Sequence, residues 1–180
     1  MTTRDHPTVG EPRAASRRGA LGALAVAAGS GLLLALAFPL VVPWVGLREV
    51  DPAGRLELLA WVALVPAILA VRAAPSARAA FLRRLVAGLA CFYAAIHWVS
   101  HAMTAFGGLP FAVALLGLTL LVLFMAAHWG AAFAISWTLR DRLGWPMHVH
   151  LPVVWAALEL CRDHLFSGFP WANVGYAQVR

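Results

Sequence analysis

The longest uncharged stretch of this chain runs from Arg84 to Arg140 and contains no Asp, Glu, Lys or Arg between them. It is too long for a single membrane helix, because about 20 apolar residues at about 1.5 Å each cross the hydrocarbon of a bilayer. Residues 106–110 read FGGLP, and Gly-Gly followed closely by Pro breaks helices. The stretch therefore predicts two consecutive membrane helices, over 85–105 and 111–138.

The composition supports an integral membrane protein. Hydrophobic residues make up 62% of the chain and charged residues 12%, whereas a soluble domain carries about 25% charged residues. Three further apolar segments, at 20–42, 56–71 and 147–163, complete the prediction of an all-α fold, a polytopic transmembrane helix bundle with about five membrane helices. The segment 56–71 is short and contains Pro66, so a re-entrant segment is an alternative for it.

Residues 1–18 are polar and basic, and they predict a disordered cytoplasmic tail ahead of a helix bundle at 19–164. The run Ser16-Arg17-Arg18 before an apolar segment is also typical of a twin-arginine export signal. The uncharged segment that follows extends from Gly19 to Leu47, which is longer than the 7–15 apolar residues of a signal peptide. We therefore predict a first membrane helix rather than a cleaved signal.

The arginines predict an orientation in the membrane, because cytoplasmic loops are enriched in positive charge. Arginines without acids occupy the connection at 72–84, and arginines also occur at 139–146. The segment 48–57 mixes both signs, and 106–110 carries no charge. This alternation predicts a cytoplasmic N-terminus and an extracytoplasmic segment 165–180.

The positive charge also bears on possible partners. The net charge is +6 and is carried entirely by arginine, since the chain contains no lysine. These arginines lie in short runs between apolar spans rather than along one continuous basic face. We therefore expect a membrane and no nucleic acid as the partner.

Three side chains of the last predicted helix share one face. Trp155, Glu159 and Arg162 are spaced i, i+4 and i+7, and an acid and a base three residues apart can pair. Ionisable residues inside a membrane are costly and mark candidate functional sites. Two interpretations are open: an interfacial ion pair that anchors the helix end, or a pair that faces the bundle interior and organises the following loop or contacts a lipid headgroup.

Two histidines of the third predicted helix form a second candidate. His97 and His101 are four residues apart and can present two imidazoles to one metal ion. No third ligand is near in sequence, so we expect no metal and no cofactor, and interpret the histidines as a packed or hydrogen-bonded pair. Both lie in the predicted outer half of the membrane, at a depth similar to Glu159 and Arg162.

The last stretch of the chain, LFSGFPWANVGYAQ at 165–178, differs from the apolar segments before it. Its aromatic residues suit the membrane–water interface, and Gly168 and Pro170 suit a tight turn. We include Phe169, Pro170, Trp171 and Tyr176 among the candidate site residues.

Several stretches, taken in order, resemble one family. They are LALAFPL (34–40), WVALVPAILA (61–70), IHWV (96–99) followed by FGGLP, and W-x3-E-x2-R followed by LFSGFPWANVGYAQ. This ordered set is similar to the N-terminal membrane part of bacterial apolipoprotein N-acyltransferases. The resemblance implies a phospholipid acyl donor and a diacylglyceryl apolipoprotein acceptor, whose N-terminal amine receives the acyl chain.

The resemblance also implies an extracytoplasmic nitrilase-like domain with a Glu-Lys-Cys triad. This chain contains no lysine, and Cys91 and Cys161 both fall in apolar segments. We therefore assign no catalytic residue and expect an N-terminal fragment or truncated product, inactive alone, in which 165–180 leads toward a missing catalytic domain. The resemblance implies that the candidate residues line a lipid or substrate cavity or organise the loop.

Two other classes stay open as alternatives. A transporter-like or channel-like bundle predicts inverted repeats and broken helices with polar groups near the membrane midplane, and no repeat is visible. A non-catalytic membrane anchor or assembly protein, the partner of a separately encoded catalytic chain, is the other alternative.

Overall fold

The structure is a computed structural model, and it describes residues 11–38, 58–165 and 173. All regular structure in these residues is helical, which confirms the predicted all-α fold. The helices are α1 (Glu11–Ala35), α3 (Leu59–Arg72), α4 (Ala77–Ile96), α5 (Trp98–Ala105), α6 (Phe111–Leu143) and α7 (Met147–His164).

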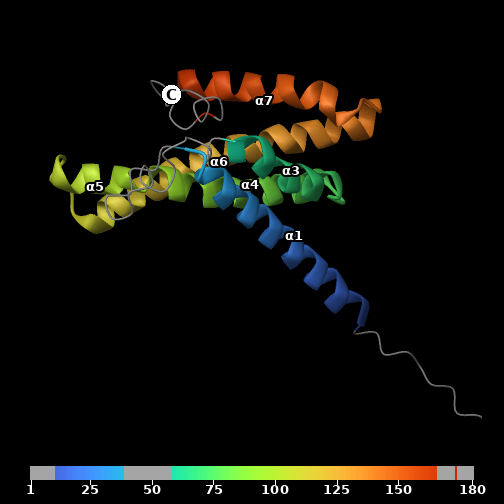
Figure 1. Cartoon of the computed structure of the whole chain (residues 1–180), viewed down its shortest axis with the longest axis horizontal. Coiled ribbons are helices and arrows are strands. Elements are labelled where there is room, and N and C mark those ends of the chain that lie inside the picture. The colour runs from blue at the N-terminus through green and yellow to red at the C-terminus, as the bar shows by residue number, and fades with distance from the viewer. Residues whose placement is uncertain (1–10, 39–57, 166–172, 174–180) are drawn as a thin grey trace, which may run out of the picture.

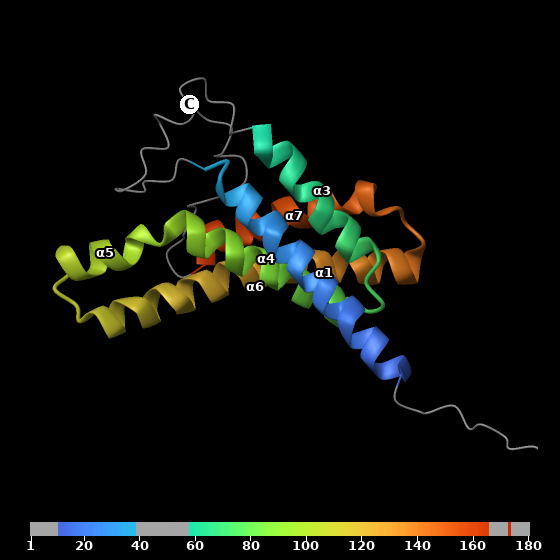
Figure 2. The same cartoon turned by 60° about the horizontal axis from the view of Figure 1, so that its bottom comes forward.

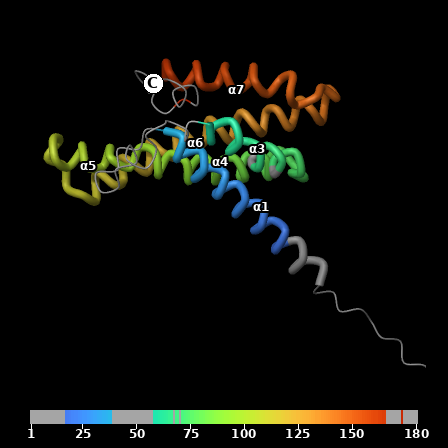
Figure 3. The backbone as a smooth tube through the Cα atoms, in the orientation of Figure 1, coloured from blue at the N-terminus to red at the C-terminus, as the bar shows by residue number. Residues whose placement is uncertain are grey.

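Helices α4 and α6 form the centre of the molecule and make its most extensive helix–helix contact. They run side by side through the middle of the backbone trace (Figure 3). Helix α7 packs along α6, and α1 crosses α4 obliquely with α3 beside it (Figures 1 and 2). A helix packed on several sides in this way can keep side chains of its inner face away from lipid and water.

Helix α6 sets the length of the bundle. It contains 33 residues, about 50 Å at 1.5 Å per residue, and exceeds the roughly 30 Å hydrocarbon layer of a bilayer. It begins at Phe111 as predicted and ends at Leu143 rather than 138. The prediction ended the helix before Arg140, but arginines in a last turn interact favourably with the helix dipole. Gly144 ends it with a left-handed φ of 67°, a conformation that favours glycine.

The third predicted helix, 85–105, is divided and begins earlier than expected. Helix α4 starts at Ala77, where the hydroxyl of the N-cap Ser76 accepts a hydrogen bond from the Ala79 amide. The prediction treated Arg83 and Arg84 as loop residues, whereas both lie in α4. The helix ends at Ile96, and α5 follows after His97 with no buried residue.

The first helix begins earlier than the predicted span 20–42. Helix α1 begins at Glu11, ahead of the predicted start of the bundle at residue 19. Ala14, Ala15 and the neighbouring arginines have high helix propensity, which lets the helix extend beyond the apolar span. Residues 1–10 lie outside the described part of the chain.

Five predicted segments thus correspond to helices, but not all of them meet the requirements for a membrane span. Within the described residues, three helical segments are long and apolar enough to cross a bilayer: Arg17–Ala35, Ala77–Ile96 and Phe111–Leu143. Helix α3 has only 14 residues, about 21 Å at the standard rise. The prediction of about five membrane helices is therefore confirmed for three.

Small residues allow the central helices to approach closely. A Cβ atom added to Gly31 of α1 would lie 2.0 Å from the Ala87 carbonyl oxygen of α4, and one added to Gly88 would lie 2.9 Å from Ala126 of α6. Next to Gly31, the buried Ser30 hydroxyl donates a hydrogen bond to the Ala63 carbonyl of α3. Backbone proximity of this kind is typical of membrane helix packing.

Candidate functional site

The predicted face of α7 is directed toward the core. The Trp155 ring lies 5.2 Å from the Trp129 ring of α6 and meets Phe133 edge-on at 5.8 Å. One and two turns further along α7, Glu159 and Arg162 line a narrow crevice together with these tryptophans. The structure therefore brings the three predicted side chains of α7 to one place.

Arg162 is completely buried, as the interior-facing interpretation of this helix face requires. Its side chain is 0% exposed, and its guanidinium carbon lies 6.0 Å from the ring centre of Phe92 on α4. An Arg162 nitrogen also lies 3.9 Å from a carboxylate oxygen of Asp163. The charge at this end of α7 is thus surrounded by protein rather than displayed at a surface.

A second buried cation, Arg84 of α4, belongs to the same site. Its guanidinium carbon lies 4.4 Å from the ring centre of Trp129, 4.9 Å from Phe133 and 5.1 Å from Trp155, and the residue is 1% exposed. A cation over an aromatic face is attracted by the electron density of the ring, by about 2 kcal/mol or more when water is excluded. The three rings form an aromatic cage around Arg84.

The aromatic cage replaces hydrogen bonds that Arg84 lacks. None of its three side-chain nitrogens has a hydrogen-bond acceptor within the described part of the chain. Glu159 lines the crevice together with Trp129 and Trp155, two of the rings that surround Arg84. An isolated buried charge is strongly destabilising, so the aromatic rings are the main support for a guanidinium in this position.

Sequence reasoning missed Arg84 because it counted the residue among the loop arginines that set orientation. A signal was nevertheless present in the spacing of small residues. Arg84 lies within a stripe of buried positions at helical spacing, which begins at Ala80 and continues through Ala87, Gly88 and Cys91. An arginine within such a stripe points to the interior of a bundle.

The end of α7 is also connected to residue 173. The Asn173 amide nitrogen donates hydrogen bonds to both carboxylate oxygens of Asp163, at 3.0 and 3.2 Å. Because Asp163 also faces Arg162, a continuous set of polar contacts runs from the buried guanidinium to Asn173. The other predicted residues of this stretch, Phe169, Pro170, Trp171 and Tyr176, lie outside the described residues.

The predicted histidines lie apart from this crevice. His97 stands at the junction of α4 and α5, and its Nδ1 lies 3.0 Å from the Ala94 carbonyl, to which it donates. His101 is exposed on α5. The crevice instead contains His128 of α6, whose Nδ1 donates to the Phe124 carbonyl at 2.8 Å.

The crevice is suited to holding charges in fixed positions. It has no room for a water molecule, and Cys91 is fully buried in the core beside it. Among the described residues, no three His, Cys, Asp or Glu side chains are grouped as metal ligands. Arg84 of α4, Trp129 of α6 and Trp155 of α7 meet at this crevice.

These features define a helical membrane domain whose interior holds a cluster of opposite charges between its central helices. The family described as apolipoprotein N-acyltransferase N-terminal domain matches residues 30–180. This match extends over more than half of the chain and includes every residue of the interior cluster. The chain belongs to this family.

Relatives in several bacteria support the same assignment. The chain is 34% identical over 152 residues to the apolipoprotein N-acyltransferase of Geobacter metallireducens, covering 84% of this chain and 26% of the relative. It is 33% identical over 139 residues to that of Bordetella bronchiseptica, covering 71% of this chain and 25% of the relative. It is 32% identical over 105 residues to that of Shewanella oneidensis, and the alignment covers 57% of this chain and 20% of the relative. The chain therefore spans about a quarter of the length of these relatives or less.

Proposed function

We propose that this chain serves as the membrane domain of an apolipoprotein N-acyltransferase. In the complete reaction, an acyl chain passes from a phospholipid to the N-terminal amine of a diacylglyceryl-cysteine lipoprotein. The observation that carries the proposal is the family match over residues 30–180. The buried charges on α4 and α7 support it, because they give the bundle a rigid end from which the segment at Asn173 continues.

The role proposed for the interior cluster is positioning rather than chemistry. Arg84 and Glu159 hold α7 against α4, and Asp163 holds Asn173. The isolated chain transfers no acyl group, because it contains no lysine for the triad that the family resemblance implies. Phospholipid and apolipoprotein are the partners of the complete enzyme, and the bundle holds it in the cytoplasmic membrane with residues 165–180 outside.

A chimera tests this proposal. The matching N-terminal region of the Geobacter metallireducens relative is replaced by this chain, and the hybrid is produced in bacteria depleted of their own N-acyltransferase. Mass spectrometry of a lipoprotein N-terminus then measures the third acyl chain. We expect the hybrid to restore N-acylation, and the same hybrid with Glu159→Gln to restore less of it at equal abundance in the membrane.

Two controls make the result decisive. This chain without the remainder of the relative should leave the lipoprotein diacylated, and the remainder without this chain should do the same. A hybrid that reaches the membrane at normal abundance but leaves lipoproteins diacylated contradicts the proposal, as does N-acylation by this chain alone.

A further inference from the structure

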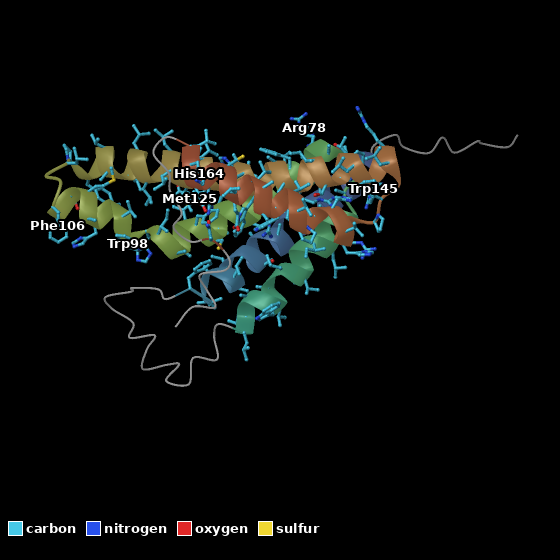
Figure 4. The ribbon with its side chains drawn as sticks, turned by 90° about the horizontal axis from the view of Figure 1, so that it is seen from above. Arg78, Trp98, Phe106, Met125, Trp145 and His164 are labelled. Carbon is cyan, nitrogen blue, oxygen red and sulfur yellow. The ribbon has the colours of Figure 1, made fainter. Side chains whose placement is uncertain are left out.

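A cavity of about 460 Å³ lies between the ends of α3, α6 and α7. It adjoins the first turns of α7, whereas the crevice at Glu159 lies along its last turns. In Figure 4 this end of the molecule is marked by Trp145, opposite the end marked by Phe106. Cavities of about 300–1,000 Å³ are typical of sites for small ligands.

The lining of this cavity is mostly apolar, with two cations. Ile68 of α3 and Met147, Leu151 and Pro152 of α7 supply the apolar surface. Arg72 and Arg140, each near the C-terminal end of its helix, supply the charges. None of the residues that line the cavity is acidic.

Arg140 is held in a fixed position at this site. One of its guanidinium nitrogens donates a hydrogen bond of 3.1 Å to the Arg72 carbonyl oxygen, and the guanidinium carbon lies 6.0 Å from the Trp137 ring. The neighbouring acid, Asp141, is exposed and lies about 100° further around the helix. It does not line the cavity.

The electrostatics of helix ends explain only part of this arrangement. The dipole of each helix favours a cation near its C-terminus, which accounts for one arginine on α3 and one on α6. It does not account for the apolar hollow that both arginines border. An apolar hollow with cations at its edge is complementary in shape and charge to an amphiphile with an anionic headgroup.

The position of the cavity along the molecule fits such a ligand. Trp145 is 56% exposed at the turn between α6 and α7, and exposed tryptophans at helix ends lie at the level of lipid headgroups. Basic pockets between membrane helices at this level bind anionic lipids. A phosphate at the arginines would leave its acyl chain running along Ile68 and Leu151.

We propose that this cavity binds one anionic phospholipid, with its phosphate at Arg72 and Arg140 and an acyl chain over the apolar lining. The lipid joins the ends of α3, α6 and α7 and is a structural ligand. This site goes beyond the proposed function and does not depend on acyl transfer.

Native mass spectrometry of the full chain in mild detergent tests the proposal. The delipidated protein is titrated with dioleoyl-phosphatidylglycerol or with dioleoyl-phosphatidylcholine. We expect the first, anionic lipid to bind at least tenfold more tightly. The double variant Arg72→Gln/Arg140→Gln should bind the two lipids equally, whereas the control Arg78→Gln/Arg142→Gln should keep the preference, because neither of its arginines lines the cavity.

A second variant tests the cavity without altering the charges. Leu151→Trp fills the hollow and leaves both arginines in place, so it should also reduce binding of phosphatidylglycerol at least tenfold. Circular dichroism verifies that each variant keeps its helix content. Equal binding of the two lipids to the unmodified chain overturns the proposal, and so does unchanged phosphatidylglycerol binding by either a folded Leu151→Trp or a folded double arginine variant.

Discussion

Arg84 illustrates how single residues determine this site. The Arg84 guanidinium lies among three aromatic rings, and the Glu159 carboxylate lines the crevice beside two of them. Breaking a buried charge pair by removing one partner costs about 3–5 kcal/mol, whereas removing both charges together costs much less. The contribution of Arg84 is therefore expected to depend on Glu159.

This dependence gives the first prediction. Arg84→Met should lower the free energy of unfolding by about 3 kcal/mol, because it removes the cation from its aromatic cage and leaves the half-buried Glu159 carboxylate without it. The double variant Arg84→Met/Glu159→Gln should recover most of that loss. Thermal unfolding in detergent measures both, with Arg78→Met as the control because Arg78 is exposed on the same helix. Strictly additive losses in the double variant would show that the two residues are not coupled.

Asp163 gives a second prediction at the same scale. Asp163→Ala removes both hydrogen bonds that Asn173 donates, so amide hydrogen exchange at residue 173 should accelerate. The exchange of α4 and α6 amides should remain unchanged, because the two hydrogen bonds join Asp163 and Asn173 and involve no residue of these helices. Asp141→Ala, an exposed acid at the other end of the bundle, serves as the control. Equal exchange at residue 173 in both variants contradicts the positioning role of Asp163.

At the scale of helices, the close approach of α1 to α4 depends on one missing side chain. An added Cβ at Gly31 would lie 2.0 Å from a backbone oxygen of Ala87, whereas Gly29 has nothing within 4 Å of such an atom. The clash involves backbone rather than a flexible side chain, so relieving it requires the two helices to separate.

The third prediction compares these two glycines. Gly31→Ala should destabilise the protein by about 1–3 kcal/mol, the usual cost of overpacking. Gly29→Ala should be neutral or stabilise by up to about 1 kcal/mol, because alanine has the higher helix propensity. Thermal unfolding in the same detergent measures both changes. Equal effects of the two substitutions would show that α1 and α4 do not approach each other closely at Gly31.

The helices themselves were largely predictable, and their ends were not. Phe111 begins α6 where FGGLP predicted it, because a Gly-Gly-x-Pro break is a local property of the chain. The start of α4 at Ala77 was missed because two arginines indicated a loop. Arginine is a good helix former, and Arg84 is buried inside the bundle because Trp129 and Trp155, distant in sequence, cover it.

For the whole molecule, the turns fall at two opposite ends. Arg72 and Arg140 border one cavity beside the turn at Trp145, and the uncharged turn at Phe106 lies at the far end of α6 (Figure 4). The helix ends that carry Arg72 and Arg140 therefore lie at the same end of the bundle, as the predicted alternation of charge requires. Which end faces the cytoplasm follows from the positive-inside rule and stays a prediction.

Reporter fusions test that orientation and give the fourth prediction. An enzyme active only outside the cytoplasm should be active when fused after Gln178 and inactive when fused after Arg78. A second reporter, active only in the cytoplasm, should give the opposite pattern at the same two positions and controls for the amount of each fusion. The reverse result for both reporters would invert the orientation.

The sequence by itself determined the membrane class, the helical segments and the family, because hydropathy, helix breakers and ordered motifs are read along the chain. It also placed Trp155, Glu159 and Arg162 on one face, since helical spacing is local. Only the tertiary structure decided that Arg84 joins them and that Arg72 and Arg140 border a common cavity. These groupings form because helices that are remote in the sequence pack together. Whether a charge is buried depends on that packing.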